Sequence, residues 1–398
     1  MKKFEYQIGV GGFVFSEREK ALIAKVLESN RLTYGPMSKQ FEMNFARLHQ
    51  TKFGLFMNSG TSALQIALTA LKAEHSWSDG DEVIIPAVTF VATANIVIHN
   101  RMTPVFVDVE PDTYNIDPCK IEEKISDRTK AIIPVHLTGL PANMDPIMEI
   151  ANNHNLAIIE DSCETMFAEY KGRPVGSFGD IGCFSTYVAH IIVTGVGGFA
   201  VTNNPKLAAS MRSLMNHGRD NIYIGCTDDQ GADGDNLKEI ISKRFHFNSI
   251  GHSFRCTEIE AAIGLGQLSR YKENISKRTE NAHNLTKGLA KFTDDIQLPT
   301  CPADRTHSYM MFGIAVKKAT KKNLVNFLES LNIETRDLFP LINQPIYSTL
   351  YGELEDQFPT ARWINQSGFY IGCHPYMENR EIEFIIEAFD YFFNHHSL

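Results

Sequence analysis

The chain has 398 residues, of which 43% are hydrophobic and 21% charged, and its formal net charge is −9 at pH 7. This length predicts one large and one smaller domain, and the composition is that of a globular protein with a sizeable core. The acidic balance excludes nucleic acid and anionic membrane surfaces as partners, because either would require a basic face.

Two sequence features bear on location. The N-terminal stretch MKKFEYQIGVGG lacks the apolar region of a signal peptide, and no segment has the roughly 18 uninterrupted apolar residues of a membrane span. The seven cysteines form no CxxC pair, which argues against a zinc site or a disulfide framework. We therefore expect a cytoplasmic protein that has no membrane segment and binds no metal.

Helix and strand patterns alternate along the first part of the chain. Helices are predicted at 16–29, 35–50, 58–73, 91–100, 117–126 and 144–155, and strands at 52–59, 81–90, 103–110, 130–137 and 156–163. Nearly continuous apolar strands that alternate with helices predict an α/β fold, in which helices cover both faces of a mostly parallel sheet.

The stretch CFSTYVAHIIVTGVGGFAVTNN, residues 183–204, has a different pattern. It predicts two strands joined by a polar turn around His190 and a glycine-rich turn. Further along, 226–236 is polar and glycine-rich and is expected to be a mobile loop, whereas 257–291 is periodic enough for one long helix.

The C-terminal part predicts strands near 309–316 and 369–374 and helices near 319–331 and 380–394. This is the pattern of a smaller α+β domain. We place the large domain, with the N-terminal segment, at 1–265 and the smaller domain at 266–398.

Three features fall where ligands gather in open α/β sheets, at the carboxyl ends of strands. In NSGTSAL, Gly60, Thr61 and Ser62 begin a helix whose free N–H groups suit a phosphate, although a helix cap without a ligand has the same pattern. In IIEDSCE, Glu160 and Asp161 stand at a strand end, where a carboxylate could pair with a ligand cation, cap a helix or form a surface ion pair. His190 follows Ser185 by five residues, and a lone histidine is more often structural than catalytic.

Taken together, the three features are more specific. With phrases such as LTYGPMSKQFE, PVFVDVEPDTYNID and GSFGDIGCFS, they resemble the DegT/DnrJ/EryC1/StrS family of nucleotide-sugar aminotransferases over nearly the whole chain. The resemblance implies fold type I, the aspartate-aminotransferase-like fold, and the cofactor pyridoxal 5′-phosphate (PLP) or pyridoxamine 5′-phosphate (PMP). It also implies a homodimer with shared active sites.

The resemblance assigns roles to individual residues. Asp161 matches the aspartate that pairs with the ring nitrogen, Phe90 matches the aromatic residue stacked on the ring, and Glu164 falls near the ring hydroxyl. The phosphate positions are Gly60, Thr61, Ser62 and Ser185, and Ser253 occupies the place of an asparagine that reaches the partner's phosphate. Three polar residues of the C-terminal domain are candidates for substrate contact: His307, Arg336 and His374.

The main departure from the family is His190, which stands where the family has the lysine that attaches the cofactor covalently. Three interpretations remain: a paralogue without catalysis, an aminotransferase or other PLP enzyme that has lost its lysine, and the 3-dehydratase branch of the family. In that branch histidine occupies this position and removes a proton, so that the C3 hydroxyl of a 4-keto-6-deoxy nucleotide sugar leaves. A pKa near neutrality would suit this base.

We favour the dehydratase branch, and within it the enzymes similar to those acting on GDP-4-keto-6-deoxymannose, with PMP regenerated from glutamate. Such a lyase would belong to deoxysugar and lipopolysaccharide biosynthesis. Ile191 and Val196 differ from the usual residues of that branch, which points to another keto sugar. A related group carries an iron–sulfur cluster, but Cys226 and Cys256 lack the close cysteine pairing of such a site, so we expect no cluster.

Overall fold

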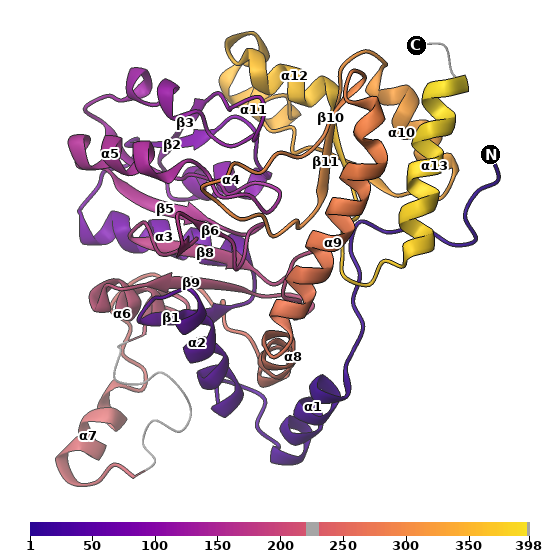
Figure 1. Cartoon of the computed structure of the whole chain (residues 1–398). Coiled ribbons are helices and arrows are strands. Elements are labelled where there is room, and N and C mark those ends of the chain that lie inside the picture. Colours follow the sequence, from indigo (N-terminus) through magenta and orange to yellow (C-terminus); the bar gives the residue numbers. More distant parts are fainter. Residues whose placement is uncertain (220–230, 396–398) are drawn as a thin grey trace.

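A seven-stranded sheet lies at the centre of the larger part of the molecule (Figure 1). The structure is a computed structural model and describes residues 1–219 and 231–395. The strand order is β1-β9-β8-β5-β4-β2-β3. Every strand is parallel to the others except β9, which pairs antiparallel with both β1 and β8. The predicted mostly parallel sheet is therefore confirmed. Its strands are β1 (Phe53–Met57), β2 (Glu82–Pro86), β3 (Thr103–Val107), β4 (Thr129–Ile132), β5 (Ala157–Asp161), β8 (Ile181–Ser185) and β9 (Gly198–Thr202).

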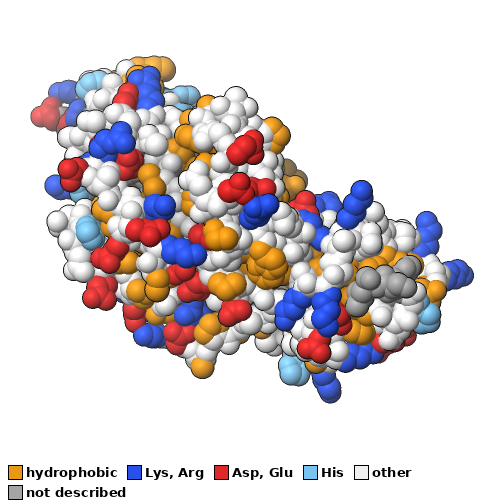
Figure 2. Space-filling model, turned by 90° about the horizontal axis from the view of Figure 1, so that it is seen from above, with side chains coloured by type: hydrophobic (Ala, Val, Ile, Leu, Met, Phe, Trp, Pro, Cys, Tyr) orange, Lys and Arg blue, Asp and Glu red, His pale blue; other side chains and the backbone are white. Residues whose placement is uncertain are grey.

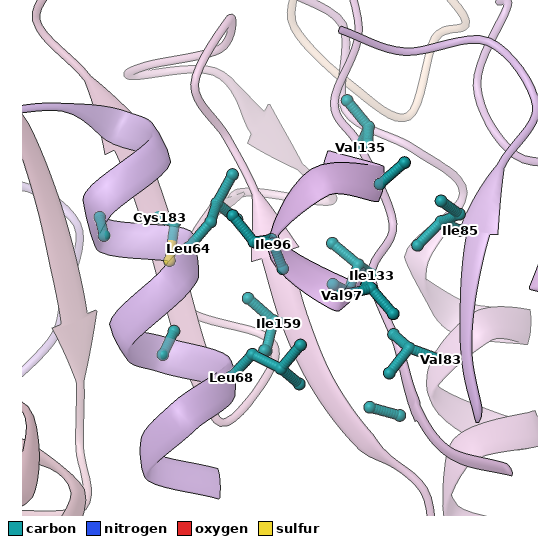
Figure 3. Packing of buried hydrophobic residues seen from close by; sticks show 14 of the residues in the cluster. Leu64, Leu68, Val83, Ile85, Ile96, Val97, Ile133, Val135, Ile159 and Cys183 are labelled. Carbon is teal, nitrogen blue, oxygen red and sulfur yellow. The ribbon is translucent and has the colours of Figure 1, made fainter. Parts of the chain in front are cut away.

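Alternate strand residues face opposite sides of this sheet, as the two-residue period of a strand requires. On one side, Val83, Ile85 and Ile159 pack against Leu64 and Leu68 (Figure 3). This face carries α3 (Gly60–Glu74), α4 (Val91–His99) and α6 (Pro205–Leu214). Because both helix and strand side chains here are nearly all apolar and fully buried, hydrophobic burial holds the face together.

The opposite face is covered by α2 (Pro36–Leu48), α5 (Met144–His154) and α8 (Glu258–Leu268). Ile84 and Ile158 point this way and pack with Ile147 of α5. Under α2, the rings of Phe45 and Phe199 stack 4.0 Å apart. The first helix, α1 (Glu17–Ser29), packs on α8 rather than on the sheet.

A second, antiparallel sheet with the order β10-β11-β13-β12 forms beside the first. It consists of β10 (Ile296–Gln297), β11 (Phe312–Val316), β12 (Thr335–Asp337) and β13 (Gly368–Ile371), with α9 (Tyr271–Leu289), α10 (Lys321–Ser330) and α13 (Asn379–His395) packed on it. The N-terminal trace runs beside α13 (Figure 1), and Ile8 lies in this second core.

The two cores exchange segments across the predicted boundary. The helices α11 (Pro345–Tyr351) and α12 (Pro359–Ser367) return to the large sheet, where Tyr347 and Ile364 are part of its core. The division into 1–265 and 266–398 therefore stays a prediction, with contacts that cross it in both directions.

Two predicted helices differ in the structure. Residues 117–126 form two 3₁₀ turns, Pro118–Lys120 and Glu122–Lys124, because the Asp117 side chain caps Cys119 N and Ile125 is already extended. The predicted long helix 257–291 is two helices, α8 and α9. It breaks where Ser269 Oγ donates to the Gly266 carbonyl and Arg270 leaves helical geometry, with φ −124° and ψ 15°.

The remaining elements are short. A two-stranded ribbon joins β6 (Glu169–Tyr170) and β7 (Arg173–Pro174), and α7 (Gly234–Lys243) projects away from the large sheet (Figure 1). Residues 226–230 of the predicted loop lie outside the described residues, and α7 begins within the rest of it. Within 1–219 and 231–395, each helix is too short or too polar to cross a membrane. Acidic and basic side chains are interspersed over the face seen in Figure 2.

Candidate active site

The carboxyl ends of β1, β2, β5 and β8 lie at one edge of the large sheet, where β9 begins. The chain leaves each of these strands into a segment that carries predicted site residues. Since ligands bind outside the carboxyl ends of parallel strands, this edge is the candidate active site.

The predicted phosphate turn begins α3 at this edge. Ser59 caps the helix by accepting a hydrogen bond from Ser62 N at 3.0 Å, and Ser62 Oγ donates to Asn58 Oδ1 at 2.7 Å. A Cβ on Gly60 would lie 2.7 Å from Cys163 Sγ and 2.8 Å from Ser185 Cβ. Only glycine therefore lets the helix start this close to the end of β8, while the Thr61 side chain remains exposed.

Asp161, the last residue of β5, is a buried carboxylate with neutral donors only. Its side chain is 4% exposed, Oδ2 accepts from Thr93 Oγ1 at 2.8 Å, and Oδ1 accepts from Cys163 N at 3.2 Å. Burial raises the pKa of Asp161, since no cation among the described residues pairs with it. The carboxylate is thus suited to a cationic group that comes from a ligand.

Its neighbour Glu160 has a different environment. The carboxylate is fully buried and accepts from Gly176 N, Phe178 N and Gly179 N at 2.6 to 2.8 Å and from His136 Nε2 at 3.1 Å. These donors satisfy the carboxylate within the protein. Glu160 therefore stabilises the loop before β8, and only Asp161 of this pair is available to a ligand.

Glu164 and Phe90 extend the site on either side of Asp161. Glu164 Oε2 accepts from Thr138 N at 2.8 Å, and burial, together with the Asp161 charge, raises the pKa of Glu164 to about 8. Phe90, between β2 and α4, is 57% exposed, although it is a large apolar ring. An exposed ring at a strand end offers a flat surface for a planar ligand.

His190 lies in the turn that connects β8 to β9. Its backbone N–H donates to Tyr187 O at 2.9 Å, and Gly195 and Gly197, with φ of 90° and 152°, return the chain to β9. His190 Nδ1 is 3.1 Å from the Ser185 carbonyl oxygen. Because a carbonyl only accepts, Nδ1 carries the hydrogen and Nε2 keeps its lone pair.

The pKa of His190 differs from the value near neutrality that the sequence suggested. Burial, with a smaller contribution from the positive charge of Arg278, lowers it from 6.5 to about 4, against the opposing effect of the Ser185 carbonyl. The imidazole is therefore neutral at pH 7, with Nε2 in the proton-accepting state. The sequence could not reveal this shift, since Arg278 lies 88 positions away.

The other predicted residues do not hydrogen-bond to this group. Ser253 is exposed and bonds Arg255, although its segment runs beside β1, where Asn58 N donates to Phe254 O. Arg336 is exposed and paired with Glu334. It does adjoin Tyr370, its partner across β12 and β13, whose raised pKa reflects burial and then the nearby Glu164.

His307 and His374 are buried. Each is 7 to 8% exposed, and burial lowers the pKa of His307 to about 3 and that of His374 to about 4. His307 Nδ1 accepts from Tyr309 N at 2.9 Å, which holds the ring flat against Tyr309. His374 lies against Gly12, whose added Cβ would be 2.9 Å from the imidazole, so the N-terminal segment closes over it.

Sequence reasoning missed two residues of the site. Thr93 holds the Asp161 carboxylate, and its place in the first turn of the helix after Phe90 was the signal that could have revealed it. Arg278 donates to the His190 carbonyl from α9, and no local pattern marks that contact. Of the two cysteines that were considered as ligands of an iron–sulfur cluster, Cys226 lies outside the described residues. Within those described, no three His, Cys, Asp or Glu side chains form a group that could hold a metal.

Comparison with known proteins agrees with this arrangement. Residues 15–390 match the DegT/DnrJ/EryC1/StrS aminotransferase family. The chain belongs to this family. Its relatives include GDP-perosamine synthase of Caulobacter vibrioides, with 35% identity over 88% of each chain. Another is the dTDP-4-dehydro-2,6-dideoxy-D-glucose 3-dehydratase of Saccharopolyspora spinosa, with 32% identity over 95% of this chain and 84% of that protein.

A solved structure gives the same fold. Escherichia coli GDP-4-keto-6-deoxy-D-mannose-3-dehydratase with bound hydrated PLP has a TM-score of 0.85, at 26% identity over 97% of this chain and all of that one. The prediction of a PLP-dependent aminotransferase fold is thereby confirmed. This family member has the family fold and a buried aspartate, Asp161, at the end of β5, but no lysine between 186 and 197.

Proposed function

We propose that this family member is a PMP-dependent 3-dehydratase that removes the C3 hydroxyl of a nucleotide-linked 4-keto-6-deoxy sugar, with His190 as the base. One observation carries the proposal. In the turn between β8 and β9, where the family resemblance places the lysine, the imidazole of His190 keeps Nε2 free and is held through Nδ1 by Ser185 O at 3.1 Å.

The cofactor is PLP or PMP, and the residues of the site fit it. The buried Asp161 carboxylate, which forms no ion pair within 1–219 and 231–395, would hold the protonated ring nitrogen. Phe90 would stack on the ring, Glu164 would lie near its hydroxyl, and the phosphate would sit at the start of α3 beside Ser185. Thr61 and Ser62 would complete the phosphate site, and Ser253 would reach the partner subunit's phosphate. When bound, PMP would supply the amine that joins the 4-keto carbon of the sugar and an electron sink for the carbon that carries that amine.

His190 would move the proton in this site. The carbonyl of Ser185 fixes the tautomer, so Nε2 is the atom that would accept the proton from the methylene carbon of PMP. The same nitrogen can return the proton to the departing C3 hydroxyl, which leaves as water. Imidazole cannot attach the cofactor covalently as lysine does, so the reaction is directed away from amine transfer.

The named relatives support both this reaction and its main alternative. The Saccharopolyspora spinosa and Escherichia coli proteins are named as 3-dehydratases. GDP-perosamine synthase, at 35% identity, favours amine transfer on a nucleotide sugar instead. We prefer dehydration because an aminotransferase needs a lysine to take the cofactor back and release the amino sugar, and this turn has none. A paralogue without catalysis would have no need of an orphan carboxylate and an exposed ring at the same strand ends.

The proposal also includes an amine donor, residues that contact the substrate and a second subunit. Glutamate is proposed as the amine donor that regenerates PMP, and His307, Arg336 and His374 as the residues nearest the sugar nucleotide. We also propose a homodimer, because a cavity lined by Thr61, Ser62 and His252 adjoins Ile250, which is 95% exposed. Sedimentation at micromolar concentration checks the dimer: a monomer would exclude a site shared between subunits.

The experiment for the function uses purified protein with PMP and a panel of GDP-, dTDP- and UDP-linked 4-keto-6-deoxy sugars. Mass spectrometry should find a product that has lost the C3 oxygen, with regeneration of the cofactor when glutamate is added. An amino sugar as the only product would establish the aminotransferase alternative. Binding of PMP without any product from the panel would contradict dehydration of this substrate class.

A further inference from the structure

Arg278 on α9 is a buried charged residue next to the candidate active site that the sequence did not predict. Its side chain is 2% exposed, and the guanidinium has no carboxylate partner among the described residues. Around it lie Cys373, His374 and Tyr376, from the segment after β13, and none of these is an acid. A buried charge without a counter-ion is costly, so its position calls for a role that offsets that cost.

The hydrogen bonds of Arg278 all run to backbone carbonyl groups. Nη1 donates to Tyr309 O at 3.1 Å and to Met310 O at 2.9 Å, and Nη2 donates to His190 O at 3.1 Å. One rigid guanidinium therefore joins the turn that carries His190 to α9 and to the strand segment before β11. Because the donors of a guanidinium are fixed in one plane, they set the position of the His190 peptide.

We propose that Arg278 is the positioning residue for His190, which it holds by its backbone carbonyl while Ser185 holds its side chain. The inference rests on the proposed function, because it gives His190 the role of the base. Between them the two contacts fix both ends of the residue. The peptide of His190 is then held against Arg278, the ring is oriented by Ser185, and Nε2 is left as the one ring atom free to act.

The charge of Arg278 adds a second effect. A cation next to an imidazole disfavours the protonated ring, so Arg278 and burial act in the same direction on the pKa of His190. From other elements, Arg278 on α9 donates to the turn, Phe56 of β1 lies against Gly197 and Gly11 packs on Ala189, and of these only Arg278 is charged. Arg278 is thus the only charged side chain of the described residues to which the shift is traced.

The test compares Arg278→Met, which fills the same space without charge or donors, with Arg278→Lys, which keeps the charge but loses the planar fork. Hydrogen exchange of residues 186–197 and NMR titration of the His190 ring, assigned with a His190→Asn variant, are measured on the full-length protein. In Arg278→Met we expect faster exchange in this segment and a higher pKa of His190. In Arg278→Lys we expect faster exchange with the pKa still low.

Arg270→Met is the matched control. Arg270, which unlike Arg278 is only half-buried, precedes α9 and bonds Val14 O and Glu19 rather than the turn. The Arg270→Met substitution should leave both the hydrogen exchange of residues 186–197 and the pKa of His190 unchanged. If Arg278→Met also leaves both unchanged, Arg278 is not the positioning residue. If Arg278→Met fails to fold, Arg278→Lys decides: faster hydrogen exchange of residues 186–197 supports the proposal, and unchanged exchange contradicts it.

Activity supplies a further readout. With a dehydration substrate, Arg278→Met should lower kcat about 10- to 100-fold and change KM by less than about threefold. The reason is that the substitution displaces the base, His190, and not the groups that bind the substrate. A rise in KM with unchanged kcat would contradict positioning of the base. Exchange and titration need no substrate, so they test Arg278 even if the protein proves to catalyse another reaction.

Discussion

The His190 ring nitrogen Nδ1 lies 3.1 Å from the carbonyl oxygen of Ser185, the residue that ends β8. The strand end that forms one wall of the proposed phosphate site therefore also orients the proposed base. A displacement of Ser185 would disturb the phosphate position and the tautomer of His190 together. This coupling makes a substitution that preserves the Nδ1 contact the sharpest probe of His190.

Asparagine is that substitution, because its amide N–H can replace Nδ1–H while nothing replaces Nε2. We expect His190→Asn to bind PMP with unchanged affinity but to lose about 10²- to 10⁴-fold in kcat, the range for a missing general base. Titration of PMP absorbance and product formation measure the two effects separately. Loss of PMP binding would mean that His190 serves the cofactor rather than the proton.

His190→Lys is the complementary change. A lysine at this position would restore the amine that the family resemblance expects, so PLP should give the yellow, covalently attached form that wild type does not form. Some amine transfer should appear as deoxygenation falls. An unchanged spectrum with PLP would show that this side chain does not reach the cofactor, and would remove the basis for His190 as the base.

Much of this site could be predicted from the sequence, because its parts are local. Gly60 starts a helix, Asp161 ends a strand, and His190 lies in a turn between two apolar strands, and each pattern shows within a few residues. The mostly parallel sheet and the helices on both of its faces follow from the same periodicity.

What the sequence could not reveal depends on contacts between distant segments. The carbonyl of His190 meets Arg278 across 88 positions, and Glu164 acquires its raised pKa, about 8, from burial among residues of other strands. The break between α8 and α9 was hidden for a similar reason, since Arg270 leaves the helix where it reaches Glu19 of α1. The helical periodicity of the hydrophobic residues continues through that break, so the sequence pattern predicts a single helix.

Asp161→Asn should stabilise the cofactor-free protein while it removes activity. Burial raises the pKa of Asp161, so the ionised form costs stability, which is lost as pH rises through the folded-state pKa. Asparagine keeps Oδ1 as the acceptor for Cys163 N, and its Nδ2 can donate to Thr93 Oγ1, without the charge. We expect a gain on the order of 1 kcal/mol at pH 7 and at least about 100-fold weaker PMP binding.

Asp108→Asn is the control for that experiment, because Asp108 is equally buried but satisfied. It accepts from Thr360 N and Ala361 N at the start of α12 and pairs with Lys120 at 3.3 Å. Its loss of charge should destabilise the protein by about 1–3 kcal/mol and leave PMP affinity unchanged. Thermal unfolding with and without PMP compares the two. Destabilisation of Asp161→Asn without cofactor would contradict the view of Asp161 as an orphan carboxylate.

Three buried histidines and the half-buried His190 should make the protein sensitive to mild acid. Burial lowers the pKa of His49, His190 and His374 to about 4 and that of His307 to about 3, from 6.5. The unfolded chain thus binds more protons than the folded one between pH 6.5 and about 4. Stability is complete above pH 6.5 and is lost as pH falls through this window.

His49 isolates one part of this effect, because it lies away from the site, fully buried, with Nδ1 3.0 Å from Val175 O. Its share is on the order of 3 kcal/mol between pH 6.5 and 4. His49→Asn should lower stability at pH 7 but flatten the dependence of the urea midpoint on pH. The same slope in wild type and variant would mean that His49 does not contribute.

Gly60→Ala tests the close approach of α3 to β8. Its methyl group would lie 2.7 Å from Cys163 Sγ and 2.8 Å from Ser185 Cβ, so the start of the helix or the end of the strand must shift. We expect a loss of about 1–3 kcal/mol and PMP binding weakened about tenfold or more, because the displaced Ser185 belongs to the proposed phosphate site. Gly313→Ala, whose methyl would meet Leu338 at an ordinary 3.7 Å, is the control and should change neither quantity. Equal effects of the two changes on PMP binding would mean that the phosphate does not bind where α3 begins beside β8.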